Sequence, residues 1–390
     1  MKTLSAITGL FTESVIREMT RVSDSMGGLN LSQGFPDFES PEGIKAAAIE
    51  AIQADLNQYP VTFGEPELRE AIARKALDYN KISCDPATDI TVTCGATEAM
   101  IATMKAIINP GDEVVIFQPF YENYGPDVIL SGATPRFVSL HAPDWHIDYD
   151  ELEKAFGDKT KAIIINTPNN PTGKVFSADD MRKIAELCIK WDVYAVTDEI
   201  YEHILYDDLK HISLASIPGM AERTITINSV SKTYSVTGWR VGWAIAPAEI
   251  TARIRKVHDF FTVGAPTPLQ HAAVKALAFK PEYYRDLQEK YSASRTHILE
   301  TLRMSGFKPF VPRGSYYVIA DVSDLFAELK AEDDFDFSRK LILKTRVATV
   351  PGFSFYAEKG LVTKTVRFAF CKKQQTLDQV RALFTEHLKV

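Results

Sequence analysis

The chain has 390 residues, of which 45% are hydrophobic and 24% are charged, and its formal net charge is −7. A chain of this length and composition is expected to form a soluble protein with two or three domains. The acidic balance argues against nucleic-acid binding, which requires a dense basic surface. No apolar stretch approaches the roughly 18 uncharged residues of a membrane span, and the N-terminus lacks a signal-peptide pattern, so we expect a cytoplasmic protein.

Four cysteines, Cys84, Cys94, Cys188 and Cys371, lie far apart in the sequence. None forms a CxxC pair, so the sequence supports neither a zinc ribbon nor thioredoxin-type redox chemistry. A chain of this length does not depend on disulfides, and we expect free thiols in a reducing compartment. The sequence predicts no metal site.

Short apolar strands alternate with helical patterns between residue 89 and about residue 280. Helices are expected at 96–108, 148–156 and 177–191, the last with an N-cap at Ser177. Strands are expected at 89–95, 112–118, 134–140, 161–166, 193–199, 224–229 and 240–246. Continuous β-branched strands separated by helices predict an α/β fold with a mostly parallel sheet and helices on both faces.

The C-terminal part of the chain has a different pattern. A long helix is expected from residue 281, followed by strands at 315–322 and 365–371 and a closing helix at 377–388. This order favours a smaller α+β domain. We therefore expect a large domain at 46–280 and a small domain made of residues 1–45 and 281–390.

Polar residues follow the expected strands at their carboxyl ends, where ligands bind in open parallel sheets. Gly95, Ala96 and Thr97 open a helix after the first strand, and the free N–H groups of a helix N-terminus attract an anion. Tyr121 follows the second strand, and the turn NTPNNPTG (166–173) follows the fourth. These positions would supply an anion site, an aromatic face and two side-chain amides.

The next two strands end in ionisable groups. Asp198 and Tyr201 follow the fifth strand, whereas Ser229, Ser231 and Lys232 follow the sixth, and Arg240 comes eight residues later. Each residue alone has an ordinary structural explanation, since aspartates cap helices, tyrosines pack, lysines are solvated and asparagines form turns. Their joint occurrence at the ends of successive strands instead indicates one binding site.

This set of side chains fits the chemistry of pyridoxal phosphate (PLP). A lysine amine forms a Schiff base with the cofactor aldehyde. A carboxylate keeps the pyridine nitrogen protonated, so that the ring accepts electrons. Tyrosine and asparagine can hydrogen-bond the ring oxygen and an aromatic side chain can stack on the ring. Arginine, serine and a helix N-terminus can hold the phosphate. We therefore predict PLP as the cofactor.

The same motifs make the chain similar to the class I/II aminotransferases, which have fold type I of the PLP enzymes. The matching segments run in the family's order along nearly the whole chain. They are SQGFPDF (32–38), NQYPVTFGEPELREAI (57–72), GATEA (95–99), PFYENY (119–124), NTPNNPTG (166–173), DEIY (198–201), SVSKTYSVTGWRVGW (229–243) and VRFAF (366–370). The resemblance implies a PLP-dependent aminotransferase (EC 2.6.1.-) with a three-layer αβα large domain.

The resemblance also implies roles for residues around the cofactor. Lys232 is expected to form the Schiff base and then to move the proton of the reaction, while Asp198 pairs with the pyridine nitrogen. Tyr201 and Asn170 are expected to contact the ring oxygen, and Tyr121 to stack on the ring. The residues expected to bind the phosphate are Ala96, Thr97, Ser229 and Arg240.

Two further roles concern the substrate and a second subunit. Arg367 is expected to form a bidentate pair with the α-carboxylate of the substrate, helped by Asn170 and the backbone of Gly34, because a planar guanidinium suits that task. Tyr59 is expected to reach the phosphate of a neighbouring subunit. The resemblance therefore implies a homodimer with shared active sites.

The motifs QGFPDF and QYPVTFGEPELREAI look most like those of kynurenine aminotransferases, also called glutamine transaminases, which take aromatic, sulfur-containing and amide amino acids. Tyr121, Tyr124 and residues 353–355 are expected to line an aromatic substrate pocket. Thr97 stands where one bacterial aspartate aminotransferase subgroup has a lysine. Many kynurenine-type enzymes have lysine where this chain has Arg240, and a tryptophan near the N-terminus, whereas the first tryptophan here is Trp145. An aspartate/2-oxoglutarate aminotransferase is the alternative.

Other classes of protein share parts of this pattern. Ser229 and Lys232 fit the SxxK motif of penicillin-binding proteins, but the accompanying SDN and KTG elements are absent. A β-lyase or a decarboxylase would use the same lysine, aspartate and phosphate site. A regulator on this fold would need an added DNA-binding segment, and a dehydrogenase would need a GxGxxG fingerprint that the chain lacks. A ping-pong aminotransferase between an L-amino acid and a 2-oxo acid is the preferred hypothesis.

Overall fold

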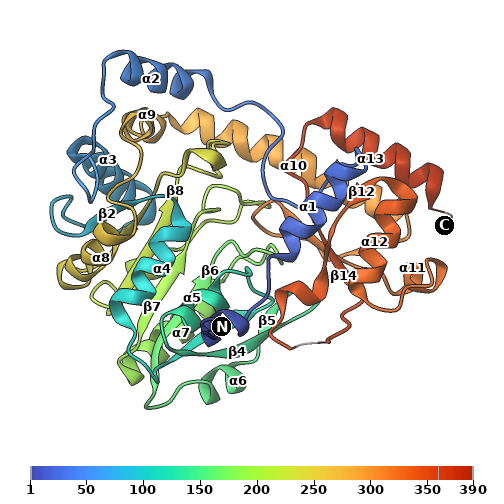
Figure 1. Cartoon of the computed structure of the whole chain (residues 1–390), viewed down its shortest axis with the longest axis horizontal. Coiled ribbons are helices and arrows are strands. Elements are labelled where there is room, and N and C mark those ends of the chain that lie inside the picture. The colour runs from blue at the N-terminus through green and yellow to red at the C-terminus, as the bar shows by residue number, and fades with distance from the viewer. Residues whose placement is uncertain (1, 359, 389–390) are drawn as a thin grey trace.

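The central element of the computed structural model is an eight-stranded sheet in the order β2-β9-β8-β7-β6-β3-β4-β5 (Figure 1). The structure describes residues 2–358 and 360–388. Neighbouring strands from β8 to β4 pair in parallel, whereas β9 and β5 run antiparallel to their neighbours. The strands are β2 (Ile90–Thr93), β3 (Glu113–Gln118), β4 (Thr134–His141), β5 (His146–Ile147), β6 (Thr160–Asn166), β7 (Tyr194–Asp198), β8 (Thr224–Ser229) and β9 (Gly242–Ile245). The predicted α/β fold with a mostly parallel sheet is confirmed.

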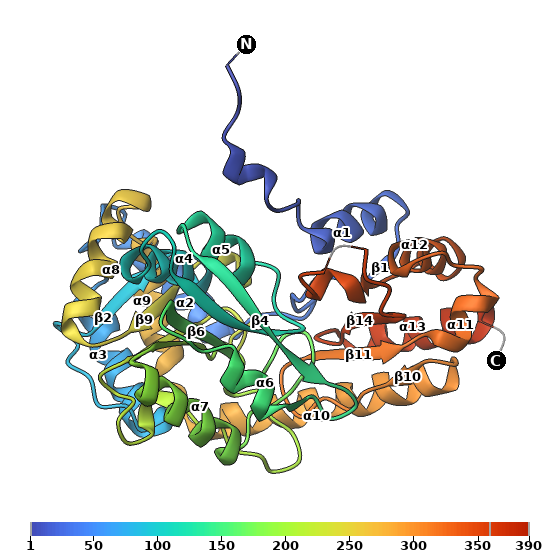
Figure 2. The ribbon, with the colours of Figure 1, turned by 90° about the horizontal axis from the view of Figure 1, so that it is seen from below.

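Alternate residues of the buried strands face two different layers of helices. Val114 and Ile116 of β3 pack on one face with α4 (Ala96–Ile107), α5 (Tyr124–Leu130) and α8 (Ala248–Phe261). Val115 and Phe117 pack on the other face with α6 (Tyr149–Lys154) and α7 (Ala178–Trp191). Because side chains of a strand alternate between faces, continuous apolar strands require cover on both sides. The result is the three-layer αβα arrangement visible in Figure 2.

Three more helices cover the sheet near β2 and β9. They are α2 (Glu42–Gln53), α3 (Pro66–Lys75) and α9 (Thr267–Leu277). Ile44 of α2 is buried in the same cluster as Leu68 of α3 and Ala273 of α9. The boundary expected between residues 45 and 46 falls inside α2, and the burial of Ile44 leads us to assign the whole helix to the large domain.

The smaller domain is built on a four-stranded antiparallel sheet in the order β10-β11-β14-β13. These strands are β10 (Lys308–Pro309), β11 (Tyr317–Asp321), β13 (Val350–Pro351) and β14 (Thr365–Ala369). A two-stranded parallel sheet joins β1 (Leu29–Asn30) to β12 (Val347–Ala348). The N-terminal segment thus adds a strand to the C-terminal part, as the proposed discontinuous small domain requires.

Helices surround the small sheet and connect it to the large domain. They are α1 (Val15–Ser25), α10 (Pro281–Met304), α11 (Ser323–Glu328), α12 (Asp334–Thr345) and α13 (Gln374–His387). Tyr283 and Tyr284, at the start of α10, pack against the large-domain core, whereas Leu287 and Tyr291 pack in the small-domain core. The single long helix α10 therefore bridges both domains (Figure 1).

Local signals explain where individual elements begin. Ser177 caps α7 by accepting a hydrogen bond from the Asp180 N–H at 3.1 Å, and the Asp180 side chain accepts one from the Ser177 N–H at 3.0 Å. This reciprocal capping box satisfies two backbone donors that the helix leaves free. Within the described residues, no helix is long and apolar enough to cross a membrane.

Candidate active site

A cleft of about 520 Å³ lies between the two domains, at the carboxyl ends of the parallel strands. All predicted site residues except Tyr59 contribute to its walls. They are Gly34, Ala96, Thr97, Tyr121, Asn170, Asp198, Tyr201, Ser229, Lys232, Arg240 and Arg367. Parallel strands end at one edge of their sheet, so residues from distant parts of the chain meet here.

Lys232 lies in the turn after β8 and extends into the cleft. Its Nζ donates a hydrogen bond to the Gly34 carbonyl oxygen at 3.2 Å and lies 5.8 Å from the centre of the Tyr201 ring. Burial of the ammonium group lowers the pKa of Lys232 to about 8. A substantial fraction of the side chain is therefore a neutral amine near physiological pH, which a nucleophilic lysine requires.

Asp198 is the last residue of β7, a strand held between β6 and β8 in the middle of the sheet. Its carboxylate is only 5% exposed and accepts a hydrogen bond from the Tyr124 hydroxyl at 2.6 Å. Burial raises the pKa of Asp198 to about 6, against the opposing effect of this hydrogen bond. A buried carboxylate in this position is prepared to receive a cationic ring nitrogen.

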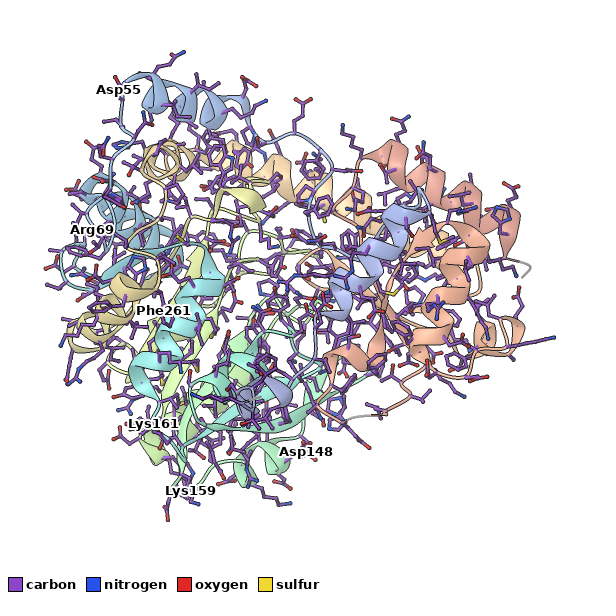
Figure 3. All side chains as sticks on the ribbon, in the orientation of Figure 1. Asp55, Arg69, Asp148, Lys159, Lys161 and Phe261 are labelled. Atoms are coloured by element: carbon purple, nitrogen blue, oxygen red, sulfur yellow. The ribbon has the colours of Figure 1, made fainter. Side chains whose placement is uncertain are left out.

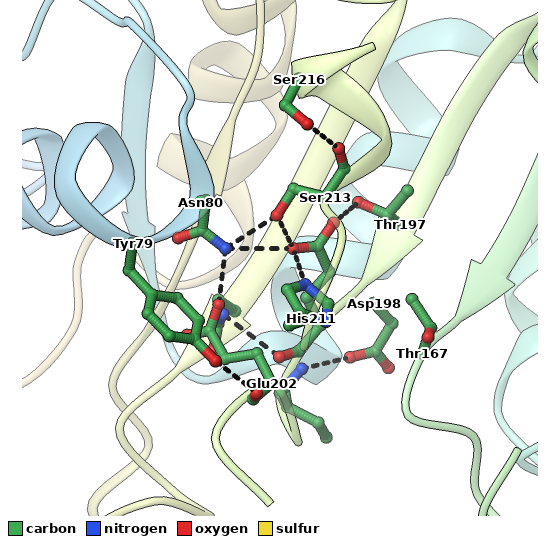
Figure 4. A network of polar contacts seen from close by, with 12 residues as sticks. Tyr79, Asn80, Thr167, Thr197, Asp198, Glu202, His211, Ser213 and Ser216 are labelled. Atoms are coloured by element: carbon green, nitrogen blue, oxygen red, sulfur yellow. Dashed lines mark hydrogen bonds and ion pairs between the residues drawn. The ribbon is translucent and has the colours of Figure 1, made fainter. Parts of the chain in front are cut away.

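A buried polar network surrounds the segment that follows Asp198 (Figure 4). The Glu199 carboxylate lies 2.7 Å from His211 Nε2. The Glu202 carboxylate accepts a hydrogen bond from the Asn80 side chain at 2.7 Å and forms an ion pair with Lys75. Ligand atoms of Glu199, Glu202 and His211 lie within 4.8 Å of one another. Because Lys75 and Asn80 already engage the carboxylate of Glu202, we interpret this cluster as a hydrogen-bonded support of the strand end rather than as an open metal site.

Hydrogen-bond donors gather at the N-terminus of α4, where the sequence predicts an anion site. Gly95, with φ of +83°, caps the helix, and a Cβ atom there would lie 2.3 Å from Nη2 of Arg240. A Cβ atom on Gly242 would lie 2.5 Å from the backbone nitrogen of Ala96. The two glycines let the guanidinium and the free helix amides approach the same point, where the buried hydroxyls of Ser229 and Ser231 also line the cleft.

Arg367 lies in the middle of β14, paired with Ile319 of β11 and Val350 of β13. It is 1% exposed, and its guanidinium donates to Asn170 Oδ1 at 2.8 Å and to the Ser32 carbonyl oxygen at 2.5 Å. Its Nε has no partner among the described residues. This rigid, desolvated guanidinium at the cleft wall suits the recognition of a carboxylate.

The tyrosines around position 34 leave no room for a side chain, so this position requires glycine. A Cβ atom at this position would lie 1.7 Å from the Tyr317 hydroxyl, and the Tyr316 hydroxyl donates to the Gly34 carbonyl oxygen at 2.9 Å. The Tyr317 hydroxyl also lies 3.1 Å from that of Tyr201. Only glycine lets the chain pass this close to the rings that face Lys232.

The predicted aromatic wall differs in part from the structure. Tyr121 and Tyr124 line the cleft with their rings edge to face at 5.7 Å. Phe355, in contrast, is fully buried behind Arg367, with its ring centre 4.9 Å from the guanidinium carbon. Residues 353–355 form a short 3-10 helix that supports Arg367, so the prediction that they line the substrate pocket is wrong.

Several cleft residues were not assigned roles from the sequence, including Asn166, Tyr317 and Arg17. Asn166 closes β6, and its side chain accepts a hydrogen bond from the Asn170 N–H at 2.7 Å. The position of Asn166 at the end of a strand could have identified it from the sequence as a cleft residue. Tyr317 and Arg17 reach the cleft only through the packing of the small domain, which no sequence pattern indicates. Tyr59 is 85% exposed and lies outside the cleft of its own chain.

The profile of the family "Aminotransferase class I and II" matches residues 27–383. The chain belongs to this family. Kynurenine–oxoglutarate transaminase 3 of Homo sapiens is 38% identical over 394 residues, covering 93% of this chain and 85% of the human protein. The predicted family is therefore confirmed.

Solved structures of aminotransferases superpose on nearly the whole chain. N-succinyldiaminopimelate aminotransferase from Mycobacterium tuberculosis has a TM-score of 0.93 at 36% identity, covering 99% of this chain and 100% of that one. YbdL from Escherichia coli, described with a methionine aminotransferase function, has a TM-score of 0.92 at 33% identity, with coverage of 99% and 100%. The chain thus has the fold type I architecture and transfers amino groups between amino acids and 2-oxo acids.

Class I and II aminotransferases depend on PLP, and the cleft of this aminotransferase fits that cofactor. The partly neutral Lys232, the buried carboxylate of Asp198 and the glycine-lined pocket beside Arg240 match its aldehyde, pyridine nitrogen and phosphate in chemical type. No observation favours a β-lyase or a decarboxylase.

Proposed function

We propose that this aminotransferase acts on a broad range of L-amino acids, including aromatic, sulfur-containing and amide side chains, by a ping-pong reaction with 2-oxo acids. The observation that carries this proposal is the meeting of Lys232, Asp198 and Arg367 in one cleft. The rings of Tyr121 and Tyr124 favour apolar and aromatic side chains in the same cleft. Relatives described as kynurenine and methionine aminotransferases support this range.

When bound, PLP supplies the aldehyde that accepts an amine and the ring that withdraws electrons from the substrate Cα. Lys232 would hold the cofactor through its amine, and the same amine would move the proton of the substrate Cα. Asp198 would keep the ring nitrogen protonated, and the Tyr124 hydroxyl holds the carboxylate in position. Tyr201 and Asn170 would hydrogen-bond the ring oxygen, and Tyr121 would stack on the ring.

Phosphate binding is assigned to the pocket at the N-terminus of α4. The backbone and side chain of Thr97, the backbone of Ala96, the Ser229 hydroxyl and the Arg240 guanidinium converge there. Arg240 is held in place by donating to the Thr237 carbonyl oxygen at 3.0 Å. A dianionic phosphate between an arginine and a helix N-terminus gains both charge attraction and several hydrogen bonds.

Binding of the substrate α-carboxylate is assigned to Arg367. Asn170 and the Ser32 carbonyl oxygen orient its guanidinium, which lines the cleft. Gly34 contributes its backbone at the same wall. A fixed guanidinium would hold the α-carboxylate in one place relative to Lys232, which lowers the entropic part of the barrier.

We further propose a homodimer in which Tyr59 completes the phosphate site of the partner. Tyr59 is 85% exposed, and Val61, Phe261 and Val263 are also exposed apolar residues, while Phe260 is 90% exposed. The two segments lie together, because the Thr267 hydroxyl donates to the Gln58 carbonyl oxygen at 2.6 Å. A clustered apolar surface of this kind marks a protein interface. Phe261 is labelled at the end of α8 in Figure 3. We expect the dimer to reside in the cytoplasm.

The half-reaction tests the proposed function. The PLP-bound protein is mixed, without an acceptor, with glutamate, aspartate, glutamine, kynurenine, phenylalanine or methionine, and its absorbance spectrum is followed. Conversion of the yellow cofactor band to the pyridoxamine band, with release of the matching 2-oxo acid, is the expected result for several donors. Reaction with aspartate alone would contradict the broad range. Release of carbon dioxide would instead indicate a decarboxylase, and release of pyruvate and ammonia from a cysteine S-conjugate would indicate a β-lyase.

A further inference from the structure

Helix α1 forms the outer wall of the cleft on the side of the small domain. Ser14 caps the helix by accepting a hydrogen bond from the Arg17 N–H at 3.3 Å. Ile16 and Met19 are buried, and Ile16 packs with Val350 and Phe355 next to Tyr121. One face of α1 is thus fixed to the small domain, and residues on its next face border the cleft.

The same helix is connected to the group that holds the α-carboxylate. The Thr20 hydroxyl lies 3.3 Å from both Ser32 Oγ and Gln33 Oε1. The Ser32 carbonyl oxygen in turn accepts a hydrogen bond from Arg367. Helix α1 and Arg367 therefore belong to one hydrogen-bonded framework, which holds the backbone of α1 beside the group that would bind the α-carboxylate.

Arg17 is the residue of α1 that brings a positive charge, unpaired among the described residues, to this wall of the cleft. It lines the cleft, is exposed, and its guanidinium makes no hydrogen bond or ion pair with any residue that the structure describes. The other cleft arginines are engaged, Arg367 with Asn170 and Arg240 with Thr237. Arg21, one turn further along α1, pairs with Glu13 at 2.7 Å.

The charge of Arg17 acts inside the cleft. Burial raises the pKa of the Tyr121 hydroxyl, and the Arg17 guanidinium acts in the opposite direction. Glu122 is the acidic neighbour on the same rim, where its carboxylate accepts a hydrogen bond from the Ser14 hydroxyl and makes no ion pair with Arg17. At this rim, the positive charge of Arg17 would attract a second negative charge on the substrate. The negative charge of Glu122 would weaken that attraction.

We propose that Arg17 binds the side-chain carboxylate of dicarboxylic amino acids and 2-oxo acids while Arg367 binds their α-carboxylate. This inference rests on the proposed function, since it needs Arg367 to hold the first carboxylate. Thr97 offers no charge for the second carboxylate, and Arg17 supplies one from a different element. Because Arg17 is exposed, its contribution to dicarboxylate selectivity is about two- to fivefold rather than the larger effect of a buried pair.

The test compares substrates that differ in the second charge. The kcat/KM values for 2-oxoglutarate and for phenylpyruvate are measured with the holoenzyme and with its Arg17→Gln, Arg21→Gln and Glu122→Gln variants. Arg17→Gln is expected to lower the ratio of the two values, 2-oxoglutarate over phenylpyruvate, about two- to fivefold, and added salt is expected to reduce this difference. Arg21→Gln, on the same helix but paired outside the cleft, should leave the ratio unchanged. Glu122→Gln should raise it.

The outcomes separate this inference from the proposed function. An unchanged ratio in Arg17→Gln, or equal losses with both acids, would overturn the role of Arg17 while leaving the aminotransferase activity intact. Failure of the unaltered enzyme to use 2-oxoglutarate, with turnover of phenylpyruvate, would do the same. Absence of the half-reaction with every amino acid and oxo acid would instead overturn the proposed function itself.

Discussion

At the scale of single residues, the environment of Lys232 decides when the enzyme can bind its cofactor covalently. The ammonium group is removed from water, and Arg240 and Arg367 in the same cleft add to the effect of burial. Asp198 opposes them, yet the pKa still falls to about 8. The position of this lysine, rather than its residue type, therefore makes it reactive.

We expect the rate at which the cofactor-free enzyme incorporates PLP to rise about tenfold per pH unit below pH 8 and to level off above it. The reason is that only the neutral amine of Lys232 attacks an aldehyde. The rate is measured by stopped-flow absorbance between pH 6 and 10. A simple alkylamine in the same buffers corrects for the ionisation of PLP. A midpoint near the ordinary lysine pKa of about 10.4 would contradict the lowered pKa.

At the scale of elements, the carboxyl end of β7 depends on α3 and on the segment that follows it. Lys75 closes α3 and pairs with Glu202, while Asn80 donates to Glu202 at 2.7 Å and to the Ser213 hydroxyl at 2.8 Å. Burial alone would raise the pKa of Glu202, but Lys75 and two neighbouring imidazoles lower it to about 2. The ion pair of Lys75 and the contacts of Asn80 shown in Figure 4 thus tie α3 and the segment after it to the strand end that carries Asp198.

Replacing Glu202 by glutamine should lower the free energy of unfolding by about 3 kcal/mol at pH 7, because Lys75 would remain buried without its partner. The shift is measured as the midpoint of urea unfolding. Glu67→Gln, an exposed change on α3, is the matched control.

The loss of stability in Glu202→Gln is expected to depend on pH. The pKa of Glu202 is lower in the folded chain than its ordinary value of 4.5, so its stabilising effect is complete above pH 4.5 and is lost as the pH falls toward 2. The difference between the unaltered protein and Glu202→Gln should therefore shrink over this range. A difference that is constant with pH would show that the ion pair is not its source.

At the scale of the whole molecule, Phe260 and Tyr59 are large apolar side chains that the single chain leaves exposed to solvent. Exposed Phe260 lies at the end of α8, in a segment joined to the Tyr59 segment by the Thr267 hydrogen bond. A site that needs Tyr59 from a second copy would be incomplete in the monomer.

Phe260→Asp is expected to convert the dimer to monomers and to reduce both PLP affinity and turnover at least tenfold, because a charge would be buried at the interface. Sedimentation velocity and PLP titration check the two parts of this prediction. Leu343→Asp, at a position on α12 that is 61% exposed, is the control for a charge added to an exposed leucine. A Phe260→Asp protein that stays dimeric would place the interface elsewhere.

Much of the fold could be predicted because its signals are local. The strand β8 was expected at its observed residues 224–229, and the Ser177 cap of α7 forms as the sequence indicates. Several strand ends differ from the expected ones by one or two residues, since the last residues of an apolar run can bond to loops instead of to a neighbouring strand. The short β5 (His146–Ile147) was missed because two residues carry no periodicity.

The sequence by itself determined the family, the cofactor chemistry and the residues that meet at the strand ends, because motif order and strand-helix alternation are properties of the chain alone. Only the tertiary structure decided which further side chains pack around these residues. It buried Phe355 behind Arg367, made Tyr124 the partner of Asp198 and brought Arg17 to the rim. Contacts between residues far apart in the chain depend on how the elements pack together, and no local pattern records that geometry.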